Sequence, residues 1–159
     1  MVDIDGVVAD VRHRLHHLER RYKDWHAFFS AADRDPPHPE GLAVVRRCLA
    51  EGLTVHWLTG RPEFMRSLTE DWLRSHDLPD APLTMRPLYN REPARLLKRE
   101  RVSALSERAE IRVVIDDDSE VVLALRKAGY PVMHAQWAPR ERWHGSDVLT
   151  QIQEGEGRT

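Results

Sequence analysis

The chain has 159 residues, 41% of them hydrophobic, and a formal net charge of -2. This length suits one globular domain with a sizeable core, and the charge excludes a general electrostatic attraction to nucleic acid, although local basic patches remain open. The single cysteine, Cys48, excludes an internal disulfide, and no apolar run is long enough to cross a membrane. Because the acidic N-terminus is unlike a secretory signal, we expect a soluble cytoplasmic protein.

The first segment, residues 2–10, reads Val-Asp-Ile-Asp-Gly-Val-Val-Ala-Asp and predicts a strand that runs into a tight acidic turn. Asp3 and Asp5 would point the same way, because residues two apart on an extended chain share a side. Two carboxylates this close repel each other, and a hard cation such as Mg2+ relieves the repulsion. By itself the segment favours an ordinary Asx-rich turn, but later segments change that balance.

The next segment has apolar residues at a 4-3-4-3-4 spacing, which predicts one amphipathic helix between residues 11 and 29. Its other faces carry basic residues, Arg12 and Arg14 among them, and three histidines. A solvated surface helix is the plainer interpretation of these side chains, and the histidine spacing matches no zinc site. The apolar positions of the helix are Val11, Leu15, Leu18, Tyr22, Trp25 and Phe29.

Three prolines make residues 33–39 a loop.

A helix over residues 40–51 is predicted to end at Gly52, and a strand over residues 53–58 follows. The strand shows little alternation, which indicates burial on both faces. Thr59-Gly60-Arg61-Pro62 comes directly after it. A hydroxyl, a glycine that permits close backbone approach and a proline suited to a first helical turn are typical of an anion-binding turn at a helix N-terminus.

The second half of the chain continues this alternation and ends one strand in Asp116-Asp117-Asp118. Three aspartates beside a buried strand are costly without compensation. One of them should cap the next helix, and the other two require a cation. Lys98, among three arginines on a predicted helix, has the plainer interpretation of a surface residue. The predicted bounds are helix 63–76, strand 83–86, a helix from about residue 93, strand 111–115, helix 120–128 and strand 131–134.

This alternation predicts an α/β domain with a mostly parallel sheet. In open sheets of this kind, ligands bind beyond the carboxyl ends of the strands. Polar clusters follow three of the predicted strands directly. We therefore expect one site assembled from three loops, which carry Asp3 with Asp5, Thr59 with Gly60, and Asp116 with Asp117.

These motifs together resemble the haloacid dehalogenase (HAD) superfamily. Asp3-Ile4-Asp5-Gly6-Val7 is similar to its first motif, Thr59 to its second, Lys98 to its third, and Asp116-Asp117 with Glu120 to its acidic fourth. The match in order and spacing runs from residue 1 to about 137. Within the superfamily, Trp57 to Glu63, Met85-Arg86 and Leu97 to Glu100 resemble the phosphatase domain of polynucleotide kinase-phosphatases.

The resemblance implies a three-layer Rossmann-like fold with a mostly parallel five-stranded central sheet. It places a single phosphatase domain at residues 1–145, with a minimal helical cap insert at residues 11–39. Residues 146–159 would form a C-terminal helix and a flexible tail, with residues 155–159 disordered. Only two residues precede Asp3, so we expect the central strand to be a stub or the start of the chain to be incomplete.

The resemblance also implies a reaction. Asp3 would attack phosphorus to form an aspartyl-phosphate, and Asp5 would act as general acid and then general base. Mg2+ would be held by Asp3, the backbone carbonyl of Asp5 and a fourth-motif aspartate. We expect Asp117 to be the direct ligand and Asp116 to act through water or Lys98.

Phosphate binding is assigned in the same way. Thr59 and the Gly60 amide would bind phosphate oxygens, and Lys98 would offset the crowded negative charge. Arg61 and Arg86 are further candidates for substrate contact. The basic face of residues 11–25, together with these arginines and Arg91, could hold a phosphodiester backbone.

A small cap leaves the site open, which favours large phosphorylated substrates. We expect nucleic-acid ends, in particular 3′-phosphates, or nucleotides. Trp25, Phe28 and Phe29 could stack a base, although helical spacing favours a core role for Trp25 and Phe29.

Other functions stay open. One is a small-metabolite phosphatase or 5′-nucleotidase with a partner subunit as lid. A second is a non-catalytic Mg2+- or phosphate-binding module, and a third is a fragment of a larger repair protein with kinase or ligase partners. A homodimer is also possible. The metal-binding fourth motif and Asp5 disfavour haloalkanoate dehalogenation.

Overall fold

The computed structural model describes residues 1–19 and 21–137. Within them, four parallel strands form two pairs, β1 with β2 and β3 with β4. Val2 lies between the pairs, because it bridges Trp57 of β1 and Ile115 of β3. The strand bounds are β1 Trp57–Pro62, β2 Leu83–Arg86, β3 Val114–Asp116 and β4 Val132–His134.

The expected five-stranded sheet is therefore wrong. The predicted first strand contributes only the bridge at Val2, which receives a hydrogen bond from Leu58 and donates one to His56. The chain leaves the extended conformation at Ile4, whose carbonyl accepts from the amides of Val7 and Val8. A ladder cannot continue through this turn.

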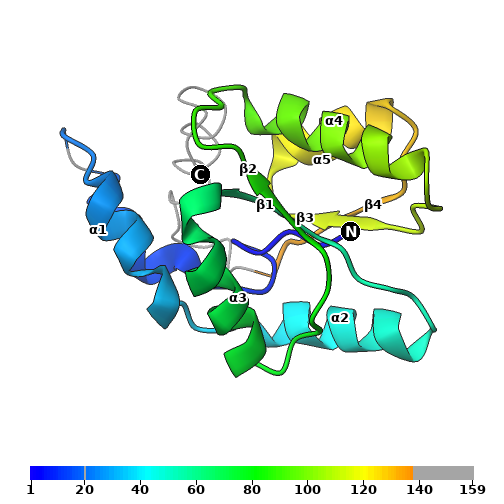
Figure 1. Cartoon of the computed structure of the whole chain (residues 1–159), viewed down its shortest axis with the longest axis horizontal. Helices are drawn as coiled ribbons and strands as arrows, with labels where there is room; N and C mark the ends of the chain where they lie inside the picture. Colours follow the sequence, from blue (N-terminus) through cyan, green and yellow to red (C-terminus); the bar gives the residue numbers. More distant parts are fainter. Residues whose placement is uncertain (20, 138–159) are drawn as a thin grey trace.

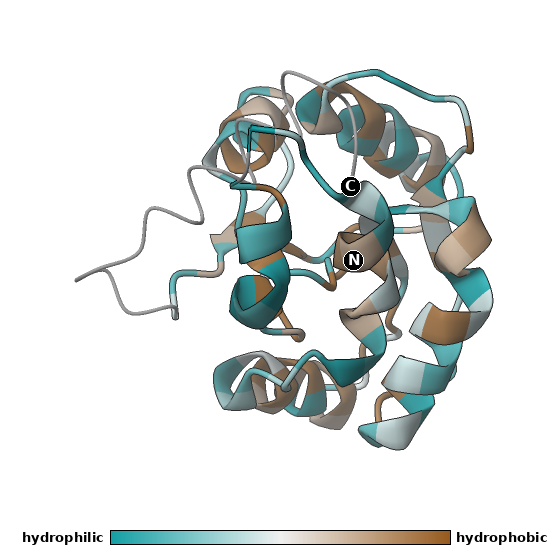
Figure 2. Cartoon of the chain, turned by 90° about the vertical axis from the view of Figure 1, so that its left-hand side faces the viewer, coloured by the Kyte–Doolittle hydropathy of each residue, from teal (hydrophilic) through white to brown (hydrophobic). Residues whose placement is uncertain are grey.

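Helices cover both faces of the strands, as the predicted layers require. Figure 1 shows α4 and α5 on one side and α2 and α3 on the other. Each carries both hydrophobic and hydrophilic positions, seen as brown and teal bands in Figure 2. Within the described part of the chain, no helix is long and apolar enough to span a membrane. The bounds are α2 Pro39–Ala50, α3 Arg66–Ser75, α4 Ala94–Ser106 and α5 Ser119–Lys127.

The prediction of a single helix in the cap insert is wrong, because the insert, in its described residues, forms three short helices. It contains a 3-10 helix η1 (Val11–His17), helix α1 (Trp25–Ser30) and a 3-10 helix η2 (Ala32–Arg34). The side chain of Asp24 caps α1 by accepting from the Ala27 amide, so a new helix starts there. The apolar spacing survives because both helices pack into one cluster, made of Val11, Leu15, Leu18 and Phe28 with Trp25 and Phe29 against it.

Several predicted bounds are confirmed. Helix α2 ends before Gly52 (φ +79°), and α5 ends before Gly129 (φ +88°). Asp118 caps α5, since its Oδ1 accepts from the Glu120 amide at 2.8 Å. Strand β2 has its predicted bounds, α4 starts directly after Pro93, and β4 lies within its predicted range.

The bounds of two strands are wrong. β1 begins at Trp57 rather than residue 53, because its pairing starts where the Trp57 amide donates to Pro82. β3 likewise begins at Val114 rather than residue 111. The predicted helix 63–76 starts as a 3-10 helix, η3 (Glu63–Met65), before α3. The predicted boundary at residue 145 and the segment 146–159 lie outside the described residues.

Candidate active site

Asp3 lies at the carboxyl end of the central bridge, one residue after Val2. Because Val2 is in register with Ile115, Asp3 comes level with Asp116 on β3. Its Oδ1 accepts from the Ile4 amide at 2.8 Å, and its Oδ2 accepts from Nζ of Lys98 at 2.6 Å. The Asp3 carboxylate is buried, and these two hydrogen bonds fix its orientation.

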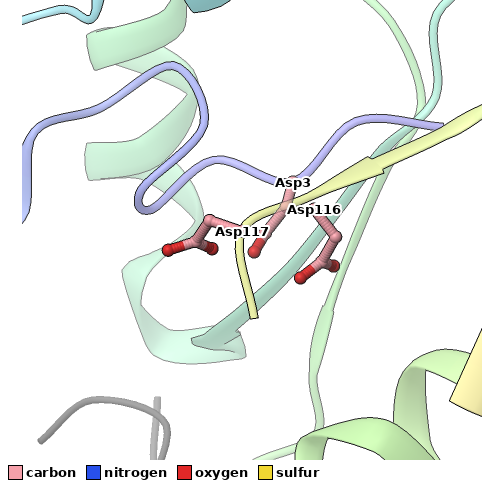
Figure 3. Close-up of side chains that lie close together, drawn as sticks. All are labelled: Asp3, Asp116 and Asp117. Carbon is pink, nitrogen blue, oxygen red and sulfur yellow. The ribbon is translucent and has the colours of Figure 1, made fainter. Parts of the chain in front are cut away.

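Lys98 comes from α4 and reaches into the same point. Its ammonium also donates to Oδ2 of Asp116 at 2.7 Å. Asp117 completes the group, and one carboxylate oxygen from each of Asp3, Asp116 and Asp117 lies within 4.8 Å of the others (Figure 3). Four of the predicted site residues therefore meet, and the interpretation of Lys98 as a surface residue is wrong.

The charges in this cluster do not balance. One ammonium faces three carboxylates. Burial raises the pKa of Asp116 to about 7, with Asp3 adding to the rise and Lys98 opposing it. Burial also raises the pKa of Asp117 well above its ordinary value, and Asp116 and Asp3 raise it further. For Lys98 burial lowers the pKa, but the neighbouring Asp116 and Asp3 outweigh burial and raise it.

This donor set fits a hard divalent cation. Carboxylate oxygens are the ligands that Mg2+ prefers, and a cation would supply the positive charge that the three aspartates lack. The turn is shaped around one of these aspartates, because Gly6 (φ +74°) leaves the space that Asp117 occupies.

Asp5 belongs to a second buried cluster. Its Oδ1 accepts from Nε of Arg61 at 2.9 Å and from Nη2 of Arg14 at 3.0 Å. The same two arginines donate to Asp35, at 2.8 Å each to its Oδ2. Burial raises the pKa of Asp5, but Arg61 and Arg14 outweigh burial and lower it to about 2. Asp5 is therefore ionised, and each arginine is held in place by two carboxylates.

Arg14 and Asp35 were missed by the sequence analysis, which placed Arg14 on a solvated face and Asp35 in a loop. Both are buried. Arg14 also lies over the ring of Phe28, 4.2 Å from its centroid, and Asp35 accepts from the Trp72 indole through its backbone carbonyl at 2.9 Å. A weak signal existed in the sequence: Arg14 lies directly before Leu15, one of the apolar positions of the predicted helix.

Thr59, Gly60 and Arg61 lie within β1 rather than in a turn at a helix N-terminus, so the predicted turn is wrong. Leu58 donates to Val2, which places Thr59 beside the Asp3 turn. The buried Oγ1 of Thr59 accepts from the Arg61 amide at 3.2 Å.

Arg86 ends β2 and is buried. Its Nη1 donates to Oδ1 of Asn90 at 3.0 Å and to the backbone carbonyl of Glu92 at 2.8 Å, and burial lowers its pKa to about 10. It lines a pocket between the cap insert and η3. The structure thus gathers Asp3, Lys98, Asp116 and Asp117 in one cluster, Asp5 and Arg61 in another, and places Arg86 at this pocket.

Comparisons with known proteins identify the family and the fold of the chain. Residues 1–138 match the family model of the polynucleotide kinase PNKP phosphatase domain. No curated protein sequence matches the chain.

Three solved structures share the fold. A chain of a Pnkp1/Rnl/Hen1 complex matches with a TM-score of 0.70 and 21% sequence identity over 84% of this chain. A chain of a Pnkp1/Rnl/Hen1 RNA repair complex matches with a TM-score of 0.67 and 23% sequence identity, also over 84% of this chain. This chain spans 43% and 40% of the lengths of those chains. The class C acid phosphatase from Bacillus anthracis with tungstate bound matches with a TM-score of 0.61 and 11% identity, over 96% of this chain and 75% of the other.

The family match covers most of the chain, and Asp3, Asp116 and Asp117 meet at the carboxyl end of β3. The chain belongs to the HAD superfamily, in the family of the polynucleotide kinase PNKP phosphatase domain, and it is a phosphoric monoester hydrolase.

Proposed function

We propose that the chain is a Mg2+-dependent phosphatase that removes 3′-phosphates from nucleic-acid ends through an aspartyl-phosphate on Asp3. The observation that carries this proposal is the meeting of Asp3 with Asp117, Asp116 and Lys98. A buried nucleophilic carboxylate beside surplus negative charge has little use unless a cation and a phosphate complete the site.

Asp3 acts as nucleophile. One of its oxygens forms a bond to phosphorus while the bond from phosphorus to the leaving alkoxide breaks, and Asp5 gives its proton to that alkoxide. Water then attacks the phosphorus of the aspartyl-phosphate and loses a proton to Asp5. The products are the alcohol, inorganic phosphate and the free Asp3 carboxylate, and Asp5 regains in the second step the proton that it gave away in the first.

Asp117 and Asp3, with the backbone carbonyl of Asp5, are the proposed ligands of Mg2+. When bound, the ion supplies the positive charge that lets an anionic carboxylate approach an anionic phosphate. Asp116 acts through Lys98, which it holds against Asp3. The Lys98 ammonium then shields the Asp3 carboxylate from the negative charge of Asp116.

The arginine pair links phosphate binding to the proton on Asp5. The low pKa of Asp5 means that its carboxylate is ionised while Arg14 and Arg61 donate to it. A phosphate bound beside Thr59 and Gly60 would accept from these guanidiniums in place of Asp5. The carboxylate would then lose its two cations, its pKa would rise, and it could carry the proton that the first step needs.

Nucleic-acid ends are the proposed substrates for two reasons. The matched family is named for a polynucleotide kinase, and one of the structural neighbours is an RNA repair complex. The cap insert is also small, with α1 only six residues long, so a polymer end can reach the cluster. Nucleotides are a second class that the same site could accept. A partner protein that carries a kinase or ligase activity fits the short span of this chain in the Pnkp1 structures.

Phosphate release from a panel of substrates tests the proposal. The panel contains 3′- and 5′-phosphorylated oligonucleotides, mononucleotides and sugar phosphates, each with Mg2+ or with EDTA. We expect Mg2+-dependent release from oligonucleotide 3′-phosphates, abolished in Asp3→Asn. Asp33→Asn is a matched control, because Asp33 is an exposed aspartate of the cap insert and should keep full activity. Release from sugar phosphates alone would refute the proposed substrate and retain the phosphatase chemistry.

A further inference from the structure

A pocket lined largely by aromatic and aliphatic side chains lies beside the proposed phosphate site. Its volume is about 630 Å³, within the usual range for small-molecule sites. Helix α1 forms one wall and η3 with α3 the other, and the two helices lie beside each other in Figure 1. We call it the Phe64 pocket. Its lining includes Trp25, Phe29, Phe64, Leu68, Arg86 and Arg91.

The aromatic rings form a connected platform. Trp25 stacks on Phe29 with ring centroids 5.5 Å apart, and Phe29 meets Phe64 edge to face at 5.4 Å. Phe64 is 63% exposed, although it is a large apolar residue. An exposed ring in a concave site is a surface on which a planar ligand can stack.

The pocket is joined to the phosphate site by β1. Pro62 lines the pocket, and Thr59 lies three residues earlier on the same strand, a span of about 10 Å at ~3.3 Å per residue. A nucleotide bridges such a span between its phosphate and its base. Arg86, which is paired with Pro62 in the register of β1 and β2, and the exposed Arg91 both line the pocket and give it positive charge.

We propose that the Phe64 pocket binds the terminal nucleobase of the phosphorylated strand by stacking. This inference rests on the proposed function, because the phosphate of the same nucleotide must lie at Asp3. The guanidiniums of Arg86 and Arg91 in the lining suit the phosphodiester that follows, since their charge is opposite to that of the phosphodiester. The occupant is therefore a nucleotide rather than an uncharged apolar group.

The pocket selects for a base without selecting among bases. Asn90 is an amide in the lining, but its oxygen accepts from Arg86 and its nitrogen donates to Glu92 at 2.8 Å. Because these contacts engage its amide, Asn90 does not read the edge of a base, and we expect stacking on ring faces, which every base offers, to dominate recognition. The four terminal bases should therefore be hydrolysed at rates within a few-fold of one another.

Steady-state kinetics on a matched pair of substrates tests the inference. One oligonucleotide ends in an ordinary 3′-phosphorylated nucleotide, and the other ends in a 3′-phosphorylated abasic sugar. For the wild type we expect a kcat/KM about 5- to 100-fold higher with the base, the range that base stacking supplies. Phe64→Ala should remove this difference through KM with little change in kcat, and Phe64→Trp should retain it.

Tyr89→Ala is the matched control. Tyr89 is an aromatic residue on the neighbouring loop, is 91% exposed and is outside the pocket lining, so its loss should leave the preference for a base unchanged. Equal kcat/KM for the two wild-type substrates, or an equal loss on both in Phe64→Ala, would overturn the inference while the phosphatase activity on nucleic-acid ends stands.

A binding assay separates failure of the pocket from failure of the proposed function. If no oligonucleotide 3′-phosphate is hydrolysed, the proposed substrate is wrong. The affinity for a fluorescent oligonucleotide with a 3′-hydroxyl end then decides the pocket by itself. A loss of about 5-fold or more in Phe64→Ala, but not in Tyr89→Ala, supports it, and equal affinities refute it.

Discussion

The carboxylate of Asp117 fills the space in which a side chain at Gly6 would begin. A Cβ atom built on Gly6 would lie 1.9 Å from Oδ2 of Asp117, closer than any non-bonded contact allows. The glycine of the first motif is therefore required by a residue from the fourth motif, 111 positions later. This relationship is steric, and it makes the acidic turn and the proposed metal ligand one unit.

Gly6→Ala should abolish the Mg2+-dependent activity because the new methyl group must displace Asp117. Gly52→Ala provides a control for backbone strain. The two glycines have nearly the same φ, +74° and +79°, but a Cβ at Gly52 would meet nothing within 4 Å. Both substitutions should cost about 1–2 kcal/mol of stability from the left-handed backbone. Phosphate release at saturating Mg2+ should fall only in Gly6→Ala, and equal losses in both variants would contradict the steric account.

Lys98→Met should destabilise the fold and remove activity. The substitution keeps an unbranched apolar stem but leaves Asp3 and Asp116 buried without their cation, which costs about 3–5 kcal/mol. Arg99→Met, at the next position of α4, replaces an exposed cation and should change stability by less than about 0.5 kcal/mol. Urea unfolding and phosphate release measure both effects. A fully active, stable Lys98→Met protein would show that the ammonium has no role.

Arg14→Gln should lower kcat/KM by about 100-fold, a typical loss for one donor to a reacting phosphate. Arg12→Gln is its control, since Arg12 pairs with Asp10 at the surface of the same 3-10 helix. Arg14→Lys should not restore activity, because a single ammonium cannot replace a guanidinium that contacts Asp5 and Asp35 together. Activity in Arg14→Gln that equals that of Arg12→Gln would show that Arg14 only supports the cap.

In the absence of metal, stability should fall as the pH rises from about 4 to 7. The folded-state pKa of Asp116 is raised to about 7, so the folded protein holds a proton that the unfolded chain releases near pH 4. The shift of Asp116 alone should lower the free energy of unfolding by roughly 3 kcal/mol between pH 4 and pH 7. Asp5, whose pKa is lowered to about 2, stabilises the fold across this window and loses that effect only at lower pH. Mg2+ should reverse the decline, because it binds the ionised aspartates.

Urea unfolding at pH 5 and pH 7.5, with EDTA and with Mg2+, measures this dependence. Asp117→Asn provides the comparison, since it removes one charge from the cluster and leaves the histidines and other titrating groups unchanged. The variant should show a smaller fall in stability between the two pH values and a weaker response to Mg2+. The same pH dependence in both proteins would locate the effect outside the cluster.

The local signals in the sequence placed most of the site. Turn residues, caps and apolar runs predicted the order of strands and helices, and the motif residues at strand ends predicted that Asp3, Asp116 and Asp117 would meet. Glycines at positive φ ended α2 and α5 as expected. These features depend on neighbouring residues, so a linear pattern records them.

The length of each β-strand was harder to predict from the sequence. Residues 53–56 are as apolar as a strand requires, but β1 begins only at Trp57, where a partner carbonyl is present. The first strand likewise shrinks to the bridge at Val2. A strand is defined by hydrogen bonds to other segments, and its bounds cannot be read from its own residues alone.

The order of the elements, the motif set and the chemistry that those residues favour can all be read from the amino-acid sequence. Which charged residues are buried depends on the folded chain. Arg14 and Arg12 look alike in the sequence, yet Arg14 is enclosed between Asp5, Asp35 and Phe28 while Arg12 remains at the surface. Burial of a charge is offset only by partners that distant segments supply, and those partners come together only when the chain folds.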